Sequence, residues 1–342
     1  MRRLLLVLAL AASACAADLT VGSATASPER HATGFLTVPA GADAGMEVPV
    51  ILVNGAKSGP TMALVAGAHG TEYASILALE EVARRADAAA LSGALIVVPL
   101  LNPASFAQKV PHLNPVDGKN MNRFYPGKPD GTQTERASYA IAQHVIEKAD
   151  YIIDYHGGDL DENMRKYSYW ADTGNARMDG VARGMVLAFG LDHIIIQRPS
   201  AAPGGPITLT RYAQQNGKPA IAVEAGHAGT TNTEDVEALV AGTFNVMRHL
   251  KMLPGDVKPV ENPLWIARAS VLTSERDGIF HPLAVPEAYV TKGMRVGYVT
   301  DYFGNTVWEA TAPVSGIVLY ICAVPSMKKG DNVVDIGEVE PR

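Results

Sequence analysis

Two kinds of hydrophobic pattern divide the chain into a longer first part and a shorter second part. In the first part, nearly all-apolar runs alternate with segments of helical periodicity. Such runs are typical of strands that are buried on both faces of a largely parallel sheet. The strand-like runs are Met62–Ala66, Ala94–Leu100, Tyr151–Tyr155 and Pro219–Glu224, and the helical patterns cover residues 72–90, 133–149, 176–189 and 233–252. The pattern predicts an α/β fold with a mixed sheet flanked by helices.

The segments on either side of this α/β pattern have a different character. Residues 18–60 mix short β-like runs with Gly and Pro turns. Beyond Lys258–Pro263, short strand-like runs are again separated by Gly and Pro, which is typical of a small all-β barrel or sandwich. We therefore place a boundary at residue 262, between an α/β domain at 18–262 and a smaller C-terminal all-β domain at 263–342.

Residues 1–17 have the features of a secretory signal. Two arginines precede the apolar run Leu4–Ala12, which is too short to span a bilayer, and small residues follow it. We expect export to the periplasm or the medium without a membrane span, and the alternative is a lipid anchor on Cys15. Cleavage would leave Cys322 as the single cysteine, which excludes an internal disulfide and a thiolate zinc site.

Composition and charge narrow the class of protein. The chain has 342 residues, of which 47% are hydrophobic, and this is enough for one sizeable core and a smaller domain. The net charge is −6, and no basic tract occurs outside the N-terminus. Nucleic-acid binding proteins usually carry a basic patch, so we expect no nucleic-acid partner.

Residues that can bind metals or move protons follow three of the predicted strands. His69 and Glu72 come after the first strand, His156 follows the third, and Glu224 ends the fourth. The carboxyl ends of strands in an open α/β sheet gather ligands at one edge, so these side chains are expected to meet. A His-x-x-Glu pair alone is weak evidence for a metal site, because a helix start capped by Thr71 or Glu72 would explain the same residues. The coincidence at three strand ends favours a metal site.

The chemistry of these residues suits zinc. His69, Glu72 and His156 would supply two nitrogens and a carboxylate to one Zn²⁺ per chain and leave a position for water, whose pKa zinc lowers to about 7. Glu224 would be the general base that takes the proton of that water. Asp154 lies two residues before His156 and so on the same strand face, where it either orients a ligand or is a structural acceptor.

A long polar loop adds a candidate binding residue. It starts at Asn102 and continues to Gly127 with little apolar periodicity. Loops of this length in a compact domain are often functional. Arg123, next to Asn122, could hold a substrate carboxylate because its guanidinium group matches a carboxylate bidentately. The alternative is a solvated surface arginine.

With these motifs, the chain resembles the succinylglutamate desuccinylase/aspartoacylase family, relatives of the zinc carboxypeptidases. The resemblance covers roughly residues 45–255, and the C-terminal part is similar to the β domain of many members. The matching pieces are Gly67–Glu72, Asn102-Pro103, Asp117–Gly127, Ile153–Gly158 and Val223–Gly226. The resemblance implies a zinc carboxypeptidase-like fold and names the roles of six residues: His69, Glu72 and His156 on zinc, Glu224 as general base, and Asn122 with Arg123 on the substrate's carboxylate.

Two departures from the family pattern bear on activity. Asn120 stands where the family usually has an Asp that steadies a zinc histidine. The family also uses an upstream Arg to polarise the scissile carbonyl, but this chain has no Arg between Arg85 and Arg123. Loss of one such donor costs about 100- to 1,000-fold in rate. Lys109 or His112 could replace it, and Arg211 or Tyr212 could also face the substrate.

The expected function is therefore zinc-dependent hydrolysis of the amide bond in an N-acyl amino acid or small peptide with a free carboxylate. One alternative is an exported carboxypeptidase that acts on cell-wall peptides. Another is a degenerate protein that binds zinc and carboxylates without turnover, as Asn120 and the missing Arg suggest. A third is a carrier role for the β domain, with a cofactor on Lys328 in the Met327-Lys328 turn.

Overall fold

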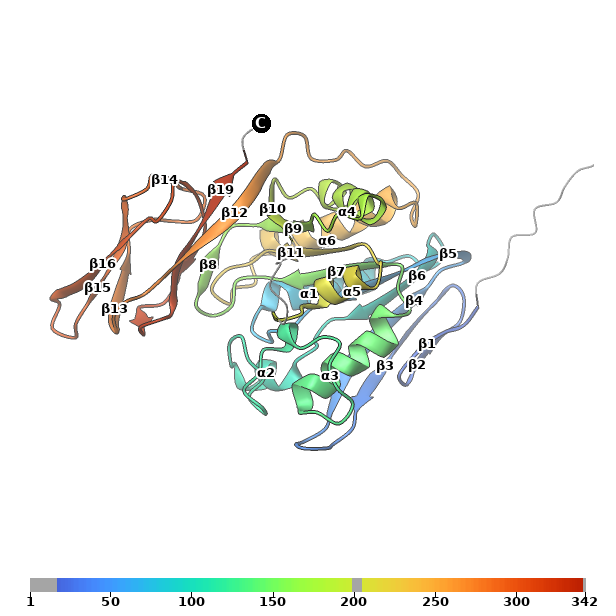
Figure 1. Ribbon diagram of the computed structural model, residues 1–342. Helices are drawn as coiled ribbons and strands as arrows, with labels where there is room; N and C mark the ends of the chain where they lie inside the picture. The colour runs from blue at the N-terminus through green and yellow to red at the C-terminus, as the bar shows by residue number, and fades with distance from the viewer. Residues whose placement is uncertain (1–16, 199–204, 341–342) are drawn as a thin grey trace, which may run out of the picture.

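The structure is a computed structural model that describes residues 17–198 and 205–340. A large mixed sheet with helices on both faces is followed by an antiparallel β region at one end of the molecule (Figure 1). This arrangement confirms the predicted α/β class. The predicted secretory segment, residues 1–17, lies outside the described residues apart from Ala17, and export stays a prediction. None of the described helices has both the length and the apolar character that crossing a membrane requires.

The central sheet contains 13 strands within the described part of the chain. The sheet is mixed, because the pairs β5–β6, β5–β7, β7–β11, β9–β10 and β10–β12 are parallel and its other neighbouring pairs are antiparallel. Its order is β14 (Tyr289–Val290), β17 (Gly316–Cys322), β19 (Asn332–Val339), β12 (Leu264–Thr273), β10 (His193–Gln197), β9 (Tyr167–Ala171), β11 (Ala220–Glu224), β7 (Tyr151–His156), β5 (Lys57–Val65), β6 (Ser92–Val98), β4 (Met46–Asn54) and β3 (Arg30–Val38), with β8 (Glu162–Met164) beside β17.

The C-terminal β region continues this sheet. Strand β12 pairs with β10 on one side and with β19 on the other, so hydrogen bonding runs unbroken past residue 262. A second sheet packs against this end and consists of β16 (Thr306–Thr311), β15 (Arg295–Thr300), β13 (Gly278–Pro282) and β18 (Ser326–Met327). The two sheets enclose a separate hydrophobic cluster that includes Phe280, Val299 and Val334. The pair β1 (Leu19–Val21) and β2 (Ala24–Ala26) lies at the other end of the molecule.

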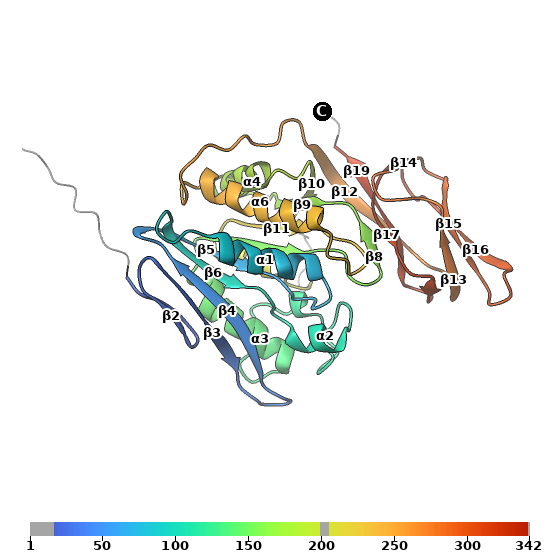
Figure 2. The same cartoon turned by 180° about the vertical axis from the view of Figure 1, so that it is seen from behind.

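Helices cover both faces of the central sheet (Figure 2). On one face, α1 (Tyr73–Arg85), α4 (Ala176–Phe189) and α6 (Thr233–His249) bury their apolar sides in one core. On the other face, α3 (Gln133–Ile141) and α5 (Leu209–Gln215) pack into a second core. The shorter elements are α2 (Pro103–Gln108), the 3-10 helix η1 (Met121–Arg123) and the π-helix η2 (Ala142–Ile146) that continues α3.

The main differences from the predicted elements concern short segments. Strands β9, β10 and β12 were not predicted, because polar residues interrupt or flank their apolar runs. Helix α1 ends at Arg85, not at residue 90, since Ala86 already has an extended backbone. The polar loop after Asn102 contains α2, whose first turn is capped by the Asn102 side chain.

A buried arginine ties helix α3 to the turn between β3 and β4. The Arg136 side chain is 3% exposed, and its guanidinium group lies 2.7 Å from the carboxylate of Asp43, which is 19% exposed. It also donates hydrogen bonds to the carbonyl oxygens of Pro39, at 2.9 Å, and Ala44, at 3.0 Å. One buried side chain thus holds several acceptors of this turn, which are themselves exposed or half-exposed.

We predict that Arg136→Met lowers the free energy of unfolding by about 2 kcal/mol, within the range for hydrogen bonds to charged groups, because the arginine is buried while its acceptors are partly exposed. Met keeps the apolar stem but removes the charge and the hydrogen bonds to Asp43 and to two carbonyl oxygens. Urea unfolding checks this. The matched control is Arg268→Met, because Arg268 is 72% exposed in its pair with Glu338 and its loss should hardly matter. Equal stability of the two variants would contradict the assignment.

Candidate active site and metal centre

Three neighbouring strands bring the candidate residues to one edge of the sheet. Strand β7 lies between β5 and β11 and is parallel to both. In this register Val65, at the end of β5, pairs with Asp154, and Glu224 pairs with His156. The carboxyl ends of all three strands therefore meet, as expected for the ligand-binding edge of an α/β sheet.

The turn after β5 directs two of these residues towards β7. It requires glycine at position 67, where φ is +67° and a Cβ atom would lie 2.9 Å from the Cα of Leu100. Glu72 precedes the first turn of α1, but its side chain makes no capping hydrogen bond, and the buried hydroxyl of Thr71 has no hydrogen-bond partner in the described part of the chain. The capping interpretation of these two residues is therefore wrong.

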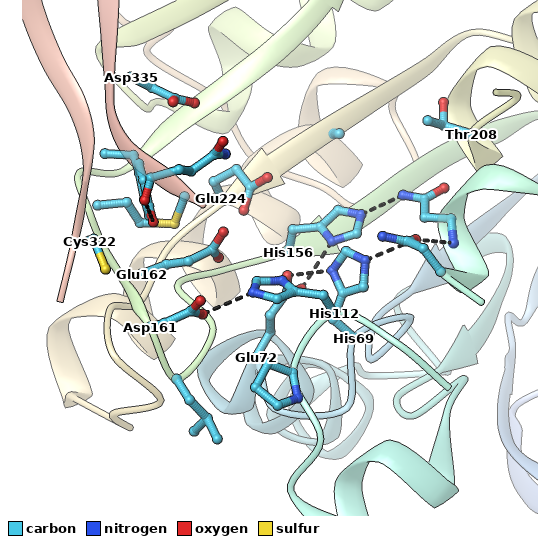
Figure 3. A pocket seen from close by; sticks show the side chains of 18 of the residues that line it. His69, Glu72, His112, His156, Asp161, Glu162, Thr208, Glu224, Cys322 and Asp335 are labelled. Carbon is cyan, nitrogen blue, oxygen red and sulfur yellow. Dashed lines mark hydrogen bonds and ion pairs between the residues drawn. The ribbon is translucent and has the colours of Figure 1, made fainter. Parts of the chain in front are cut away.

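The Glu72 carboxylate instead lies between two imidazole rings (Figure 3). Its Oε1 is 2.6 Å from Nδ1 of His69, and its Oε2 is 3.0 Å from Nδ1 of His156. The three residues are buried, and their potential ligand atoms lie within 4.8 Å of one another. Two imidazoles and one carboxylate that converge in this way fit the donor set of a zinc ion with an open position.

The outer nitrogen of each ring is held by a neighbouring side chain. Nε2 of His69 lies 3.2 Å from the Asn120 oxygen, and Nε2 of His156 lies 3.2 Å from a carboxylate oxygen of Asp154. Such contacts fix the ring orientation and aim the inner nitrogens at the metal position. Asp154 thus contacts a candidate ligand, and Asn120, although neutral, contacts the other.

The charges of the neighbouring histidines keep the Glu72 side chain ionised. Burial by itself would raise the pKa of this carboxyl, but the two histidines lower it to about 2. The group is therefore ionised at neutral pH, as a metal-binding carboxylate must be.

Glu224 lies close to the three candidate metal ligands. It lines the same cavity, beside His156 in the strand register. Burial raises the pKa of Glu224 well above its usual range, and the nearby carboxylates of Glu72 and Glu162 act in the same direction. A carboxyl that holds a proton more tightly is suited to accept one during a reaction.

The site opens into a cavity of about 860 Å³. The α/β region forms one side of it, and the C-terminal β region forms the other through Tyr320, Cys322, Val324, Ser326, Lys328, Asp331, Asn332 and Asp335. Among the described residues, the acidic ones on its lining are Glu72, Asp154, Asp161, Glu162, Glu224, Asp331 and Asp335. The lysine and arginine residues on the described lining are Arg123 and Lys328. The cavity is therefore predominantly acidic.

The two predicted carboxylate-binding residues differ in their availability. Arg123 is exposed on the cavity lining, and its guanidinium group donates a 2.7 Å hydrogen bond to the Asn122 carbonyl. The Asn122 side chain is buried: Oδ1 accepts from the N–H of Leu209, and Nδ2 faces both Asp154 and His156. Asn122 is thus already bonded within the protein, while Arg123 can reach a ligand.

The other predicted residues differ in whether they line the cavity. His112 lines the cavity with its Nε2 at 2.9 Å from Asp161. Lys109, Arg211 and Tyr212 are not among the described lining residues. Lys328 does line the cavity and is exposed, and its backbone N–H donates to Asp331.

Four residues of the cavity lining were not predicted from the sequence: Glu162, Tyr167, Tyr169 and Asp335. Glu162 follows the loop after β7, and Tyr167 and Tyr169 lie on β9, where their spacing of two places both on one strand face. Asp335 comes from β19 in the C-terminal region. The alternation in β9 was the available signal, but nothing in the sequence indicates that Asp335 reaches the site.

Comparison with protein families identifies the catalytic region. The family model for the succinylglutamate desuccinylase/aspartoacylase catalytic domain matches residues 58–250. A curated relative, the N-alpha-acetyl-L-2,4-diaminobutyric acid deacetylase of Halomonas elongata, is 28% identical over 317 residues, which cover 90% of this chain and 91% of that protein.

Solved structures agree over nearly the whole chain. A succinylglutamate desuccinylase from a Silicibacter species is 25% identical, with a TM-score of 0.82 over 93% of this chain and 98% of that one. A product-bound ectoine utilization protein from Ruegeria pomeroyi is 26% identical, with a TM-score of 0.82 over 92% of this chain and 98% of that one. The family match spans more than half of the sequence and contains the site residues His69, Glu72, His156 and Glu224. The chain belongs to the succinylglutamate desuccinylase/aspartoacylase family.

Proposed function

We propose that the protein is a zinc-dependent deacylase that hydrolyses the amide bond of small N-acyl amino acids bearing a free carboxylate. One observation carries the proposal: His69, Glu72 and His156 converge beside Glu224, in a cavity that also contains Arg123. Family members are named as hydrolases that remove acyl groups, and the Halomonas relative is named as a deacetylase, which supports an amide substrate.

His69, Glu72 and His156 would hold the zinc ion. Zinc in such a site supplies Lewis acidity, which makes water nucleophilic at neutral pH. Asn120 and Asp154 keep the two rings in place from behind. These contacts preorganise the ligands, so that little reorganisation accompanies binding of the ion.

The remaining residues bind the substrate and move the proton. Arg123 would hold the substrate carboxylate through its guanidinium group, while Asn122 keeps the end of β7 connected to α5. Glu224 would take a proton from water and pass it to the departing amine, as a general base and then a general acid. The cavity volume of about 860 Å³ lies within the range of small-molecule sites, which favours a small substrate over a long peptide.

The exported carboxypeptidase is the alternative that shares this chemistry. It differs in the acyl side of the substrate, which would then be a peptide. The C-terminal β region lines one side of the cavity and narrows the space for such a chain. The binding-only alternative is motivated by the neutral Asn120 and by the lack of an arginine between Arg85 and Arg123.

We predict one zinc ion per chain and its loss in His156→Ala. This variant removes one of the three donors, and a site of two remaining donors binds zinc weakly. Metal analysis after dialysis measures the stoichiometry. The control is His281→Ala, because His281 stacks on Tyr298 in the C-terminal region and does not line the cavity. Retention of one zinc ion by His156→Ala would exclude the proposed ligand set.

We predict that Glu224→Gln lowers kcat by about 100- to 10,000-fold, the usual contribution of a general base. The amide side chain keeps the size of the carboxylate but cannot accept the proton. Zinc content should stay at that of the wild type, and the control Glu275→Gln, on an exposed residue outside the cavity, should keep full activity. If the wild type turned over no N-acyl amino acid or peptide but still bound carboxylates, the binding-only alternative would replace the enzyme.

We predict that Arg123→Lys raises KM for N-acyl amino acids roughly 10- to 100-fold, because lysine keeps the charge but loses the two parallel hydrogen bonds to the carboxylate. The matched measurement uses the same substrates with the carboxylate converted to an amide. These should be poor substrates of the wild type and should respond little to the substitution. An equal effect on both series would show that Arg123 does not contact the carboxylate.

A further inference from the structure

One part of the cavity lining carries two carboxyl groups that form no ion pair with a lysine or arginine among the described residues. Glu162 and Asp335 both line it, from β8 and β19 respectively. The charge of His112 lowers the pKa of Glu162, whereas burial is the cause that raises the pKa of Asp335. Both residues are half-buried, and a carboxylate partly removed from water is stabilised by a cation that arrives from outside.

Asp335 provides the most direct observation. Its Oδ1 atom is buried and has no hydrogen-bond partner in the described part of the chain. Burial raises the pKa of Asp335 to about 6 and, together with the charge of Glu72, that of Glu162 to about 7. The shift of Asp335 expresses the cost of removing its carboxylate from water.

The surroundings of these carboxylates also suit a cation. Figure 3 shows Glu162 and Glu224 between Asp335 and the histidines. The rings of Tyr167 and Tyr169, 5.4 Å apart and perpendicular, line the same wall and offer faces on which an ammonium group can rest. Burial and the charges of all three carboxylates raise the pKa of Tyr169, so this ring lies among them.

The charged residues of the whole cavity also favour a cationic ligand. Seven carboxyl groups on its described lining stand against Arg123, Lys328 and His112, whose pKa is raised to about 9. A cleft with this field concentrates cations and repels anions. Lys328 does not neutralise the wall, because it is exposed and makes no ion pair with Glu162 or Asp335 among the described residues.

We propose that Glu162 and Asp335 select substrates that carry a cationic group, such as a side-chain amine, at the end of the molecule away from the carboxylate held by Arg123. The inference rests on the proposed deacylase function and specifies its substrate class. The preferred substrates are N-acyl derivatives of basic amino acids. Substrates with a second carboxylate at that end are disfavoured, because their charge repels the same wall.

The test uses the zinc-loaded protein and three substrates of similar length: N-acetyl-L-ornithine, N-acetyl-L-glutamine and N-acetyl-L-glutamate. Their side chains end in a cation, a neutral amide and an anion. We expect kcat/KM for the ornithine derivative to exceed that for the glutamine derivative at least tenfold, and the glutamate derivative to be the poorest of the three. A charge-assisted hydrogen bond contributes enough for a difference of roughly this size.

Two variants assign the preference to residues. Glu162→Gln retains an oxygen for the N–H of Asp159, which Glu162 accepts at 3.0 Å, so the loop can keep its structure. Asp335→Asn removes the charge from an oxygen that lacks a partner. Each should reduce the ornithine-to-glutamine ratio of kcat/KM roughly tenfold. The control Glu275→Gln should not change the ratio, and thermal unfolding checks that the variants are folded.

A binding measurement separates failure of this inference from failure of the proposed function. Calorimetry with free L-ornithine, L-glutamine and L-glutamate should show the tightest binding for ornithine and a loss of that advantage in both variants. If the glutamine or glutamate derivative were hydrolysed as well as the ornithine one, the selection would be refuted while the deacylase function stood. If nothing were hydrolysed, the deacylase function would fail, and equal binding of the three amino acids would refute the selection as well.

Discussion

The rest of the site depends on the contact of one carboxylate with two imidazoles that come from different strands. Glu72 reaches His69 within its own turn and His156 across the neighbouring strand. This contact requires β5 and β7 to be adjacent and parallel, so that both carboxyl ends lie at the same edge. It also requires the left-handed turn at Gly67, which aims the chain back over the strand ends. The fold of the α/β region is therefore a condition for the candidate metal centre.

The C-terminal β region gives this centre its chemical environment. It is joined to the central sheet by β12 and β19, and side chains from β17 to β19 form one wall of the cavity. That wall contributes Asp331 and Asp335 together with Lys328, while Glu162, Tyr167 and Tyr169 of the α/β region line the same cavity as the candidate metal ligands. The chemistry of such a site lies at the strand ends, and we propose that the acidic residues around them set its specificity.

Neighbouring side chains fix the orientation of the candidate ligands. Asn120 and Asp154 hold the outer nitrogens of the two rings, and Asn122 connects Asp154 to the start of α5. Asn122 thus connects these elements and also lines the cavity. The loop that carries Asn120, Asn122 and Arg123 is accordingly part of the support of the metal centre as well as of its substrate side.

The sequence by itself determined the α/β class and the residues that meet at the strand ends, because buried strands, helical periodicity and polar strand termini are local patterns. It did not determine that Asn122 is already bonded within the protein, or that Lys109, Arg211 and Tyr212 lie away from the cavity. Nor did it indicate that Asp335, more than 100 residues after Glu224, faces the same cavity. These facts depend on how distant strands pack and on side-chain direction, which only the tertiary structure decides.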